Sequence, residues 1–344
     1  MRIGLIVAVS CLLFGTALGA DEPQDQVRYQ GFDGMVLLKD TPTKTVYVVC
    51  HDRKDRPKDR PLSWLGLLTW EKDKGTRWEP LRVTVPEGQD PPSDLETCCR
   101  VPGREDLILT AESGYWSRSG PVKYGRVILF RLPDDPLSRD LEWVRSYRPF
   151  PVPEKPTVKH DQVEGMECVR IGENELALVF VTVGEAGERA TIRWGKLDLD
   201  ASADADVYDE RGTCHLTPGD GPLNARACGG AYIKKPNEDV PQRAVWCSAT
   251  YDPGDEGPFE SIVYRAGTLR RVAGPKLFEY GALAKPVLRW RLDGVKVEAI
   301  AEAPSGIPDA ICAVATDDED YVGIWRVPVS YTHLRAHETS RAIS

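Results

Sequence analysis

The sequence predicts an all-β protein, a β-propeller with five recognisable blades. Apolar runs of strand length recur about 60–70 residues apart, each followed by a polar loop and a further run. Such a fixed period is typical of propeller blades. The 344-residue chain also contains 30 Gly and 27 Pro, a composition that favours turns over long helices. An all-β sandwich is the alternative, because strands alone do not require that a ring closes.

Residues 94–132 are the reference unit for this repeat. They contain three apolar strands, at residues 95–101, 106–111 and 125–132. The first two are joined by a turn at residues 102–105, where Gly103 accepts a positive φ easily. Equivalent second strands are expected at residues 46–50, 176–183, 244–249 and 310–316, third strands at 65–70, 191–197, 261–266 and 322–327, and fourth strands at 78–85, 141–147 and 269–272.

The two ends of the chain are set apart from this repeat. Residues 1–20 have a basic start, an apolar run and small residues near Ala20, which predicts a secretory signal peptide. The mature chain is then exported, periplasmic or extracellular, with no membrane span. Residues 330–344 resemble a translated sequencing adapter and are expected to be a non-native tail. A single propeller domain is therefore expected to span residues 27–329. Two alternatives for closing the ring stay open: a sixth blade in the untruncated protein, or closure of a five-bladed ring with the help of residues 27–38.

The formal net charge of −9 argues against nucleic acid as a partner and is compatible with cations. Besides Cys11, eight cysteines remain, and an even number in an exported chain makes disulfides plausible. Eight cysteines allow 105 pairings. The single pairing we predict is Cys214–Cys228, while several others lie in apolar strand runs where Cys acts as a small hydrophobic residue.

Acidic residues recur at the start of the first strand and the end of the second strand in four of the five units, whereas Asn224 and Arg226 occupy the equivalent region of the fourth. Antiparallel pairing brings these two positions together, so we expect a carboxylate rim on one face of the propeller. Such a rim suits Ca²⁺, which takes several oxygen ligands with loose geometry. The alternative is that these acids cap backbone groups or are simply solvated. The predicted metal ligands are Asp33, Asp52, Glu96, Glu164, Glu298, Asp317 and Glu319.

Further residues are candidates for chemistry at the same rim. Glu164 and Glu298 could act as catalytic carboxylates, His51 as a general base and Arg226 as the rim's inner cation. Glu96, Glu112, Tyr115 and Trp116 are the predicted ligand-binding residues, because the two rings could stack on a sugar. Their alternative role is to anchor the loop that contains them.

Two resemblances follow from short motifs. QVEGM at residues 162–166, the related VEA and DLE segments, and TDDED at residues 316–320 resemble the β-propeller phytase and phytase-esterase-like group. That resemblance implies calcium held by Glu164 and Glu298, then Asp317 and Glu319, with substrate phosphates bridging to the ion. Separately, Asp73, Gly75 and Trp78 resemble the Asp-box turn of sialidase-like propellers, which is a folding element.

Together these patterns predict an exported propeller whose carboxylate-rimmed face binds a small-molecule, glycan, peptide or protein ligand, with calcium as the expected mediator. The alternative is a calcium-dependent, phytase-like or esterase-like hydrolase of phosphoesters. A shared fold is weak evidence of shared chemistry, so the sequence leaves both functions open.

Overall fold

The structure is a computed structural model that describes residues 31–52, 63–113, 125–134, 138–150, 162–182, 190–201, 207–216, 230–234, 242–254, 257–318 and 323–328. The predicted signal peptide and tail lie outside these ranges, as do Tyr115, Trp116, Arg226, Cys228 and Glu319. All regular structure in the described residues is β-strand. They contain no helix with the length and apolar character of a membrane span.

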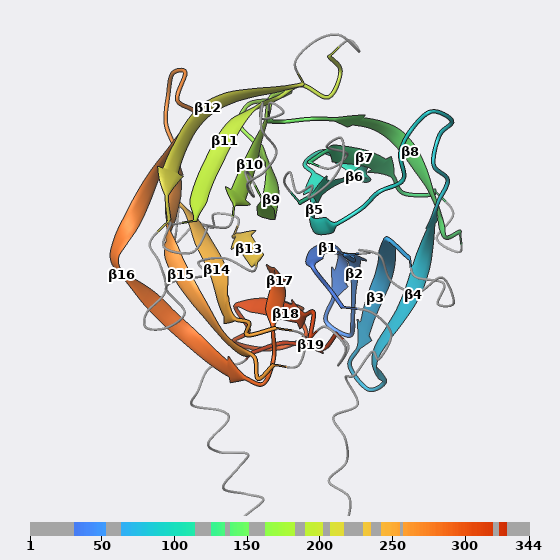
Figure 1. Cartoon of the computed structure of the whole chain (residues 1–344), viewed down its shortest axis with the longest axis vertical. Coiled ribbons are helices and arrows are strands. Elements are labelled where there is room, and N and C mark those ends of the chain that lie inside the picture. The colour runs from blue at the N-terminus through green and yellow to red at the C-terminus, as the bar shows by residue number, and fades with distance from the viewer. Residues whose placement is uncertain are drawn as a thin grey trace, which may run out of the picture.

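The strands form five antiparallel blades arranged around a central axis (Figure 1). Blades 1 and 2 share one sheet, because their outermost strands β4 and β8 pair in parallel through Arg82 and Asp140. Blade 1 contains β1 (Gly34–Thr41), β2 (Lys44–Cys50), β3 (Leu65–Glu71) and β4 (Gly75–Val83), and blade 2 contains β5 (Leu95–Val101), β6 (Arg104–Glu112), β7 (Val127–Arg131) and β8 (Asp140–Tyr147). Blade 3 contains β9 (Val163–Arg170), β10 (Leu176–Thr182), β11 (Thr191–Leu197) and β12 (Tyr208–His215). Blade 4 contains β13 (Gly230–Ile233), β14 (Arg243–Tyr251), β15 (Glu260–Arg271) and β16 (Phe278–Asp293), and blade 5 contains β17 (Val297–Glu302), β18 (Cys312–Thr316) and β19 (Trp325–Arg326).

The innermost strands close the ring. Strand β5 contacts β1 and β9, strand β13 contacts β9 and β17, and β17 returns to contact β1. Figure 1 shows these five strands nearest the axis, with β4, β8, β12 and β16 at the periphery. The five-bladed propeller predicted from the sequence is therefore confirmed, and the described blades close without a sixth.

Small residues let the inner strands approach closely. A Cβ on Gly34 would lie 2.5 Å from the Cα of Thr97 in the next blade. A Cβ on Gly230 would lie 2.2 Å from the carbonyl oxygen of Glu298. Real Cβ atoms do not tolerate such distances, so glycine is what permits backbone contact between blades here.

The core consists of apolar clusters between neighbouring blades. Cys98 of β5 belongs to the cluster shared by blades 1 and 2, whereas the adjacent Cys99 belongs to the cluster shared by blades 2 and 3. Successive side chains of a strand point to opposite faces, and both faces of an inner strand are covered. This explains why the inner strands appear in the sequence as continuous apolar runs.

One strand prediction was wrong. A fourth strand was expected at residues 269–272, but residues 269–271 are the end of β15, and the fourth strand is β16. The register pairs Arg271 with Phe278, so β15 continues through the region that the sequence assigned to a new strand. Strand β12 was also not expected, because its residues are largely polar and exposed. An outermost strand is covered on one face at most, so it carries little apolar signal.

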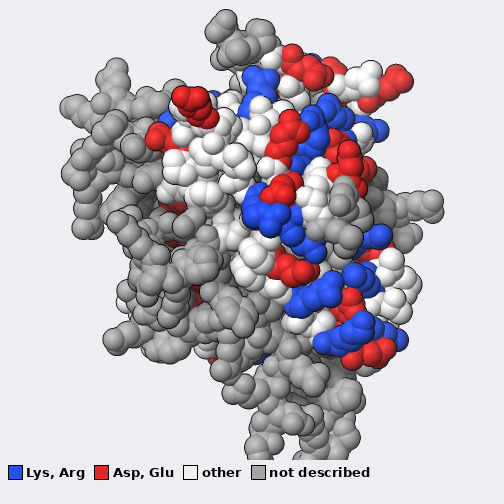
Figure 2. Space-filling view, turned by 90° about the vertical axis from the view of Figure 1, so that its right-hand side faces the viewer, with Lys and Arg blue, Asp and Glu red and all other residues white. Residues whose placement is uncertain are grey.

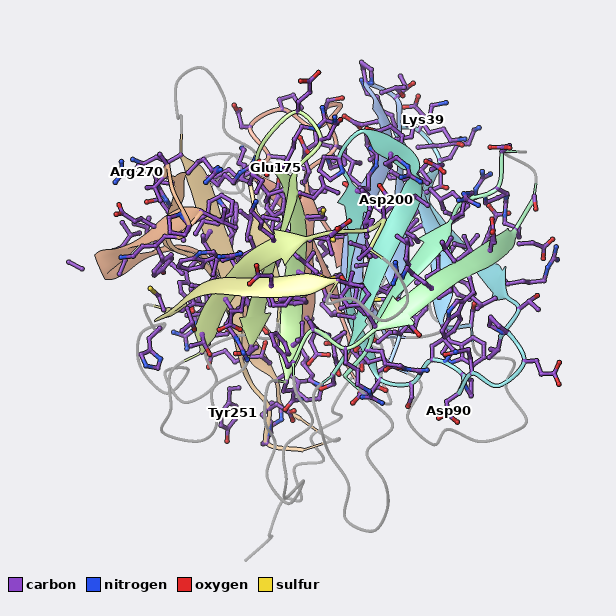
Figure 3. All side chains as sticks on the ribbon, turned by 90° about the horizontal axis from the view of Figure 1, so that it is seen from above. Lys39, Asp90, Glu175, Asp200, Tyr251 and Arg270 are labelled. Atoms are coloured by element: carbon purple, nitrogen blue, oxygen red, sulfur yellow. The ribbon has the colours of Figure 1, made fainter. Side chains whose placement is uncertain are left out.

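The propeller has two distinct faces. Asp90 and Tyr251 lie on one face, and Lys39, Glu175 and Arg270 lie on the other (Figure 3). On the outer side of blades 1 and 2, basic and acidic side chains alternate over the surface (Figure 2). Arg82 pairs there with Asp140 at 2.6 Å, and both side chains are largely exposed. Exposed ion pairs of this kind contribute little to stability. The candidate functional site lies on the face that carries Asp90 and Tyr251.

Candidate functional site

A β-bulge places an acid at the same position in three blades. In blade 2, Leu95 pairs with Glu112 and Thr97 with Ala111, so Glu96 has no partner in the ladder. Glu164 in blade 3 and Glu298 in blade 5 occupy the corresponding gaps of β9 and β17. Bulges commonly redirect a side chain next to a functional site. The recurrence of Glu at this bulge is therefore a structural repeat and not only a sequence pattern.

The residue after each acid is small, which marks the position in the sequence. Asp33 precedes Gly34 in blade 1, where its N–H donates to the Cys50 carbonyl oxygen at 3.1 Å. In blade 4, strand β13 begins at Gly230, so Gly229 is the residue that precedes it in the sequence. The first strand of blade 4 therefore begins later than the alignment with Asn224 and Arg226 predicted, and both of those residues lie outside the described ranges.

The acids gather into two triads. Asp33, Glu298 and Asp317 form one, and Asp52, Asp94 and Glu96 form the other. Within each triad, one oxygen from each carboxylate lies within 4.8 Å of the others. Five of the six residues were predicted from the sequence, and the triads confirm that they come together. We refer to the six residues as the acidic arc.

Each triad spans the boundary between two blades. Asp317 follows the second strand of blade 5 and meets Asp33 at the first strand of blade 1. Asp52 follows the second strand of blade 1 and meets Glu96 at the first strand of blade 2. The backbone N–H of Asp52 also donates to the Asp33 carboxylate at 2.5 Å, which joins the triads into one arc.

Electrostatics in the arc are dominated by burial and like charge. Burial raises the pKa of Asp33 well above its usual value, and the nearby Asp317, Glu298 and Asp52 carboxylates raise it further. Lys296 supplies positive charge at one end, with its ammonium 3.0 Å from Glu298 and 3.9 Å from Asp252. That side chain is only 11% exposed, so its charge is poorly screened by water.

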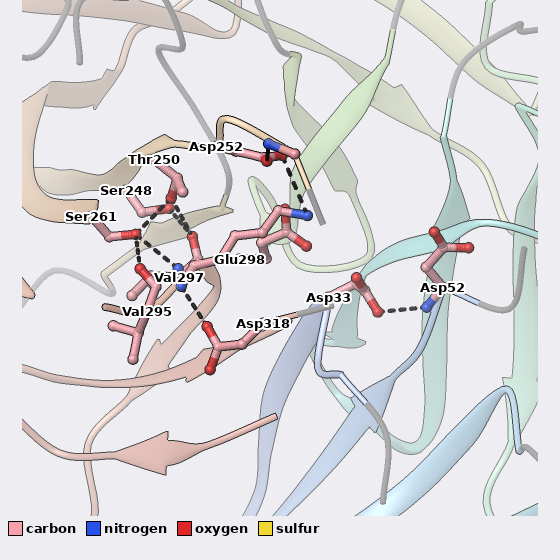
Figure 4. A network of polar contacts seen from close by, with 12 residues as sticks. Asp33, Asp52, Ser248, Thr250, Asp252, Ser261, Val295, Val297, Glu298 and Asp318 are labelled. Atoms are coloured by element: carbon pink, nitrogen blue, oxygen red, sulfur yellow. Dashed lines mark hydrogen bonds and ion pairs between the residues drawn. The ribbon is translucent and has the colours of Figure 1, made fainter. Parts of the chain in front are cut away.

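Buried hydroxyls of blade 4 hold the strand that carries Glu298. Ser261 donates to the Val295 carbonyl oxygen and accepts from the Val297 N–H, both at 2.9 Å. The Ser248 hydroxyl donates to the Val297 carbonyl oxygen at 2.9 Å. These bonds satisfy backbone groups of Val295 and Val297, the residues on either side of Lys296 (Figure 4). The position of Glu298 is thus set by contacts across a blade boundary.

Glu112 lies within one residue of Glu96 in register, as predicted, but its side chain serves a different purpose. Its carboxylate accepts from the Arg126 guanidinium at 2.5 and 2.9 Å and from the Ser93 N–H at 3.1 Å. The Glu112 side chain is fully buried, and burial raises its pKa although Arg126 acts in the opposite direction. Glu112 is therefore part of an internal ion pair that ties a loop to blade 2.

His51 is also engaged internally. Its Nδ1 lies 2.5 Å from the Gly31 carbonyl oxygen, and its Nε2 lies 3.2 Å from the Trp78 indole nitrogen. The indole N–H can only donate, so Nε2 accepts and Nδ1 carries the proton. The ring is completely buried, and these contacts do not favour the general base predicted for it. Trp78 belongs to the Asp-box-like turn, which lies between β3 and β4 as expected.

The remaining predicted residues divide into two groups. Glu164 is buried at its bulge in blade 3, outside the two triads. Cys214 has a free thiol in β12, and its predicted partner Cys228 lies outside the described residues, so their disulfide stays a prediction. Tyr115, Trp116 and Glu319 also fall outside the described ranges.

Two site residues were not predicted. Asp94 completes the second triad from a backbone with a φ of 56°, a conformation that Asp and Asn tolerate better than most residues. Its position directly before an apolar strand was the available signal. Lys296 is the second site residue that was not predicted. The available signal was a cation between two apolar residues, Val295 and Val297.

No protein-family model and no curated protein matches the sequence. Among solved structures, the chain is similar to an endo-arabinanase of glycoside hydrolase family 43 from Bacillus licheniformis, with 10% identity, a TM-score of 0.46, and 88% of this chain and 94% of that one covered. An exo-β-1,3-galactanase from Phanerochaete chrysosporium shares 8% identity at a TM-score of 0.44, over 88% of this chain and 63% of its own length. A family-32 β-fructofuranosidase from Bombyx mori shares 12% identity at a TM-score of 0.44, over 89% of this chain and 62% of its own.

The chain thus spans less than two thirds of the length of the galactanase and of the fructofuranosidase. None of the three is a phytase or an esterase, so that part of the sequence resemblance stays a prediction. A likeness at this level of identity assigns no activity to this chain.

Proposed function

We propose that the acidic arc binds Ca²⁺ and that the ion recruits an oxygen-rich ligand, such as a glycan, to this face. The observation that carries the proposal is the pair of inter-blade carboxylate triads, whose ligand oxygens lie within 4.8 Å of one another. Oxygens bound to the same Ca²⁺ at 2.3–2.6 Å lie at most about 5 Å apart. The donor set and its spacing therefore fit this ion.

Charge supports the same proposal. Burial raises the pKa of Asp33, and repulsion from the neighbouring carboxylates raises it further. A divalent cation offsets this repulsion and stabilises the ionised form of each carboxylate. Lys296 offsets part of the charge at the Glu298 end. The triad of Asp52, Asp94 and Glu96 is the better candidate for the ion, because Lys296 contacts a member of the other triad.

Ligand capture follows from the coordination number of calcium. Ca²⁺ takes 6–8 oxygen ligands, and three carboxylates cannot supply all of them unless each binds through both oxygens. Open positions on the ion can bind vicinal hydroxyl or carboxylate oxygens of a glycan. In this proposal, the protein holds the ion at one end of the central axis of the propeller.

The test begins with calcium alone. Chain stripped with EDTA is titrated with CaCl₂ or MgCl₂ while its melting temperature is followed, and bound metal is counted by elemental analysis. Binding at 100 times Kd stabilises the fold by about 2.7 kcal/mol. Glu96→Gln should reduce the shift, whereas Glu142→Gln, on an exposed surface pair, should not. An unchanged melting temperature with no bound calcium would overturn the proposal.

Ligand capture is tested separately with the calcium-loaded chain. A neutral and an anionic polysaccharide are offered in CaCl₂ and in EDTA, and binding is measured by calorimetry. Binding in calcium that EDTA abolishes supports the proposed recruitment. Calcium binding without polysaccharide binding retains the metal site and rejects the glycan as its ligand.

A second candidate is calcium-assisted hydrolysis of a phosphoester on the same arc. Lys296 favours it, because a cation beside a metal site can neutralise phosphoryl oxygens. We expect phosphate release from phytate or p-nitrophenyl phosphate in CaCl₂ that EDTA and Glu298→Gln abolish. Absence of release by a chain that binds calcium would leave the binding function and exclude this one.

A further inference from the structure

Two neighbouring cysteines of β5 face different blades. Cys98 belongs to the apolar cluster between blades 1 and 2, which also contains Cys50. Cys99 belongs to the cluster between blades 2 and 3, which also contains Cys168. All four have free thiols in the structure. Each boundary of blade 2 therefore contains one cysteine from either side.

The Cys50 and Cys98 side chains approach each other at the boundary between blades 1 and 2. Cys98 donates to the carbonyl oxygen of Val48 at 3.6 Å, so its sulfur reaches across to β2. Val48, Cys50 and Cys98 lie in the same apolar cluster. Val48 and Cys50 are two residues apart on one strand, and their side chains therefore lie on the same face. The proximity of Cys98 to Cys50 therefore follows from the positions of these residues on β5 and β2.

Gly34 is the residue that allows this approach. A Cβ at Gly34 would lie 2.5 Å from the Cys50 sulfur and 2.5 Å from the Cα of Thr97, the residue before Cys98. Strands β1, β2 and β5 are therefore packed so closely here that only a glycine fits between the Cys50 sulfur and the backbone that precedes Cys98. Both cysteines are buried, with exposed fractions of 0% and 3%.

We propose that Cys50 and Cys98 form a disulfide that covalently joins blades 1 and 2 directly beneath the acidic arc. Cys50 lies two residues before Asp52, and Cys98 lies two residues after Glu96. The bond therefore ties together the two strands that bring these triad members within ligand distance. This inference does not rest on calcium binding, because the bond is detected directly.

Disulfide formation requires a two-electron oxidant, and a small disulfide such as glutathione disulfide supplies it. The Cys98 thiolate attacks one sulfur of the oxidant, forming a mixed disulfide and releasing one glutathione thiolate. The Cys50 thiolate then attacks the Cys98 sulfur and releases the second glutathione. Two protons and two electrons leave the cysteines, and the oxidant becomes two thiols. Cys98 is among the residues that line a cavity of about 350 Å³.

The experiment refolds the chain from denaturant in glutathione disulfide or in dithiothreitol, because both thiols are buried in the folded protein and the oxidant reaches them only in the unfolded chain. Free thiols are then blocked in denaturant, and tryptic peptides are mapped without reduction. Trypsin releases Cys50 in residues 45–53 and both Cys98 and Cys99 in residues 83–100. We expect these two peptides to be cross-linked after oxidation and separate after reduction.

Two variants identify the cysteine of β5 that is used. Cys98→Ala should lose the cross-link, and Cys99→Ala should keep it. The oxidised chain should also melt higher than the reduced chain, on the order of 5–10 °C for a loop of this length. The proposal would be overturned if Cys50 carried the thiol-blocking group in all of the oxidised sample. A cross-link that survives Cys98→Ala would overturn it as well.

Discussion

The backbone N–H of Asp52 donates a hydrogen bond to the side chain of Asp33 at 2.5 Å. Asp33 belongs to the triad with Glu298 and Asp317, and Asp52 to the triad with Glu96. This single bond therefore joins carboxylates contributed by three blades into a continuous arc. A substitution at Asp33 should therefore alter the geometry of both triads.

The pKa of Asp33 predicts a pH dependence of stability in the metal-free chain. Its pKa is raised in the folded state, so folded protein holds the proton up to a higher pH than unfolded protein does. This stabilising contribution is complete below the unfolded value of about 4 and is lost as the pH rises through the folded value. In EDTA, the free energy of unfolding should therefore fall as the pH rises above about 4.

The Asp33→Asn variant tests the source of that slope. An amide stays neutral and still accepts from the Asp52 N–H, so the variant should show a flatter pH profile in urea titrations. Asp293→Asn, at a largely exposed surface position, serves as the control and should leave the slope unchanged. Equal slopes in the two variants would exclude Asp33 as the group responsible.

Ser261→Ala should destabilise the blade boundary behind Glu298. The substitution leaves the Val295 carbonyl oxygen and the Val297 N–H without their buried hydroxyl partner. Such a loss costs about 1–3 kcal/mol. Ser146→Ala removes an exposed hydroxyl with a long contact to Gln89 and should cost less than about 0.5 kcal/mol. Chemical denaturation of both variants measures the difference, and equal stabilities would contradict this role for Ser261.

Glu112→Gln should be strongly destabilising, because it leaves the guanidinium of Arg126 buried without its carboxylate. The exposed fractions of these side chains are 0% and 8%. Removal of one partner of a buried ion pair costs about 3–5 kcal/mol.

The matched control for Glu112 is Asp140→Asn, which breaks a 2.6 Å ion pair with Arg82 on the outer surface. Both of those side chains are more than 60% exposed, so the loss should not exceed about 1 kcal/mol. Unfolding free energies measured in urea should therefore separate the two variants clearly. A small effect at Glu112 would show that water replaces the lost carboxylate.

Gly230→Ala should open the ring between blades 4 and 5. The added Cβ would lie 2.2 Å from the carbonyl oxygen of Glu298, and neither backbone can move without disturbing an inner strand. We expect a loss of at least about 1–3 kcal/mol and weaker calcium binding. Gly281→Ala, on an outermost strand with 3.0 Å to the Thr268 hydroxyl, is the control and should be milder. Similar melting temperatures for both variants would contradict the close packing inferred at Gly230.

Much of the site could be predicted from the sequence, because register in an antiparallel pair depends on local hydrogen bonds and turns. The proximity of Asp33 to Asp52, and of Glu298 to Asp317, followed from that logic and is confirmed. The role of Glu112 could not be predicted, since Arg126 reaches it from the loop before β7 with a geometry that spacing does not specify. The burial of His51 was missed for the same reason, as its partner Trp78 comes from another strand.

Periodic apolar runs, turn residues and the acid before a small residue were enough to establish the blades, their order and the positions of the acids along each strand. These features are local, because a strand and its hairpin partner are close in sequence. Which acids share a triad was decided by the closure of the ring, which brings β17 against β1 and β1 against β5. The two triads, and the apolar cluster that contains Cys50 and Cys98, join residues of different blades. The packing between blades therefore determines them, and not the spacing of the residues along the chain.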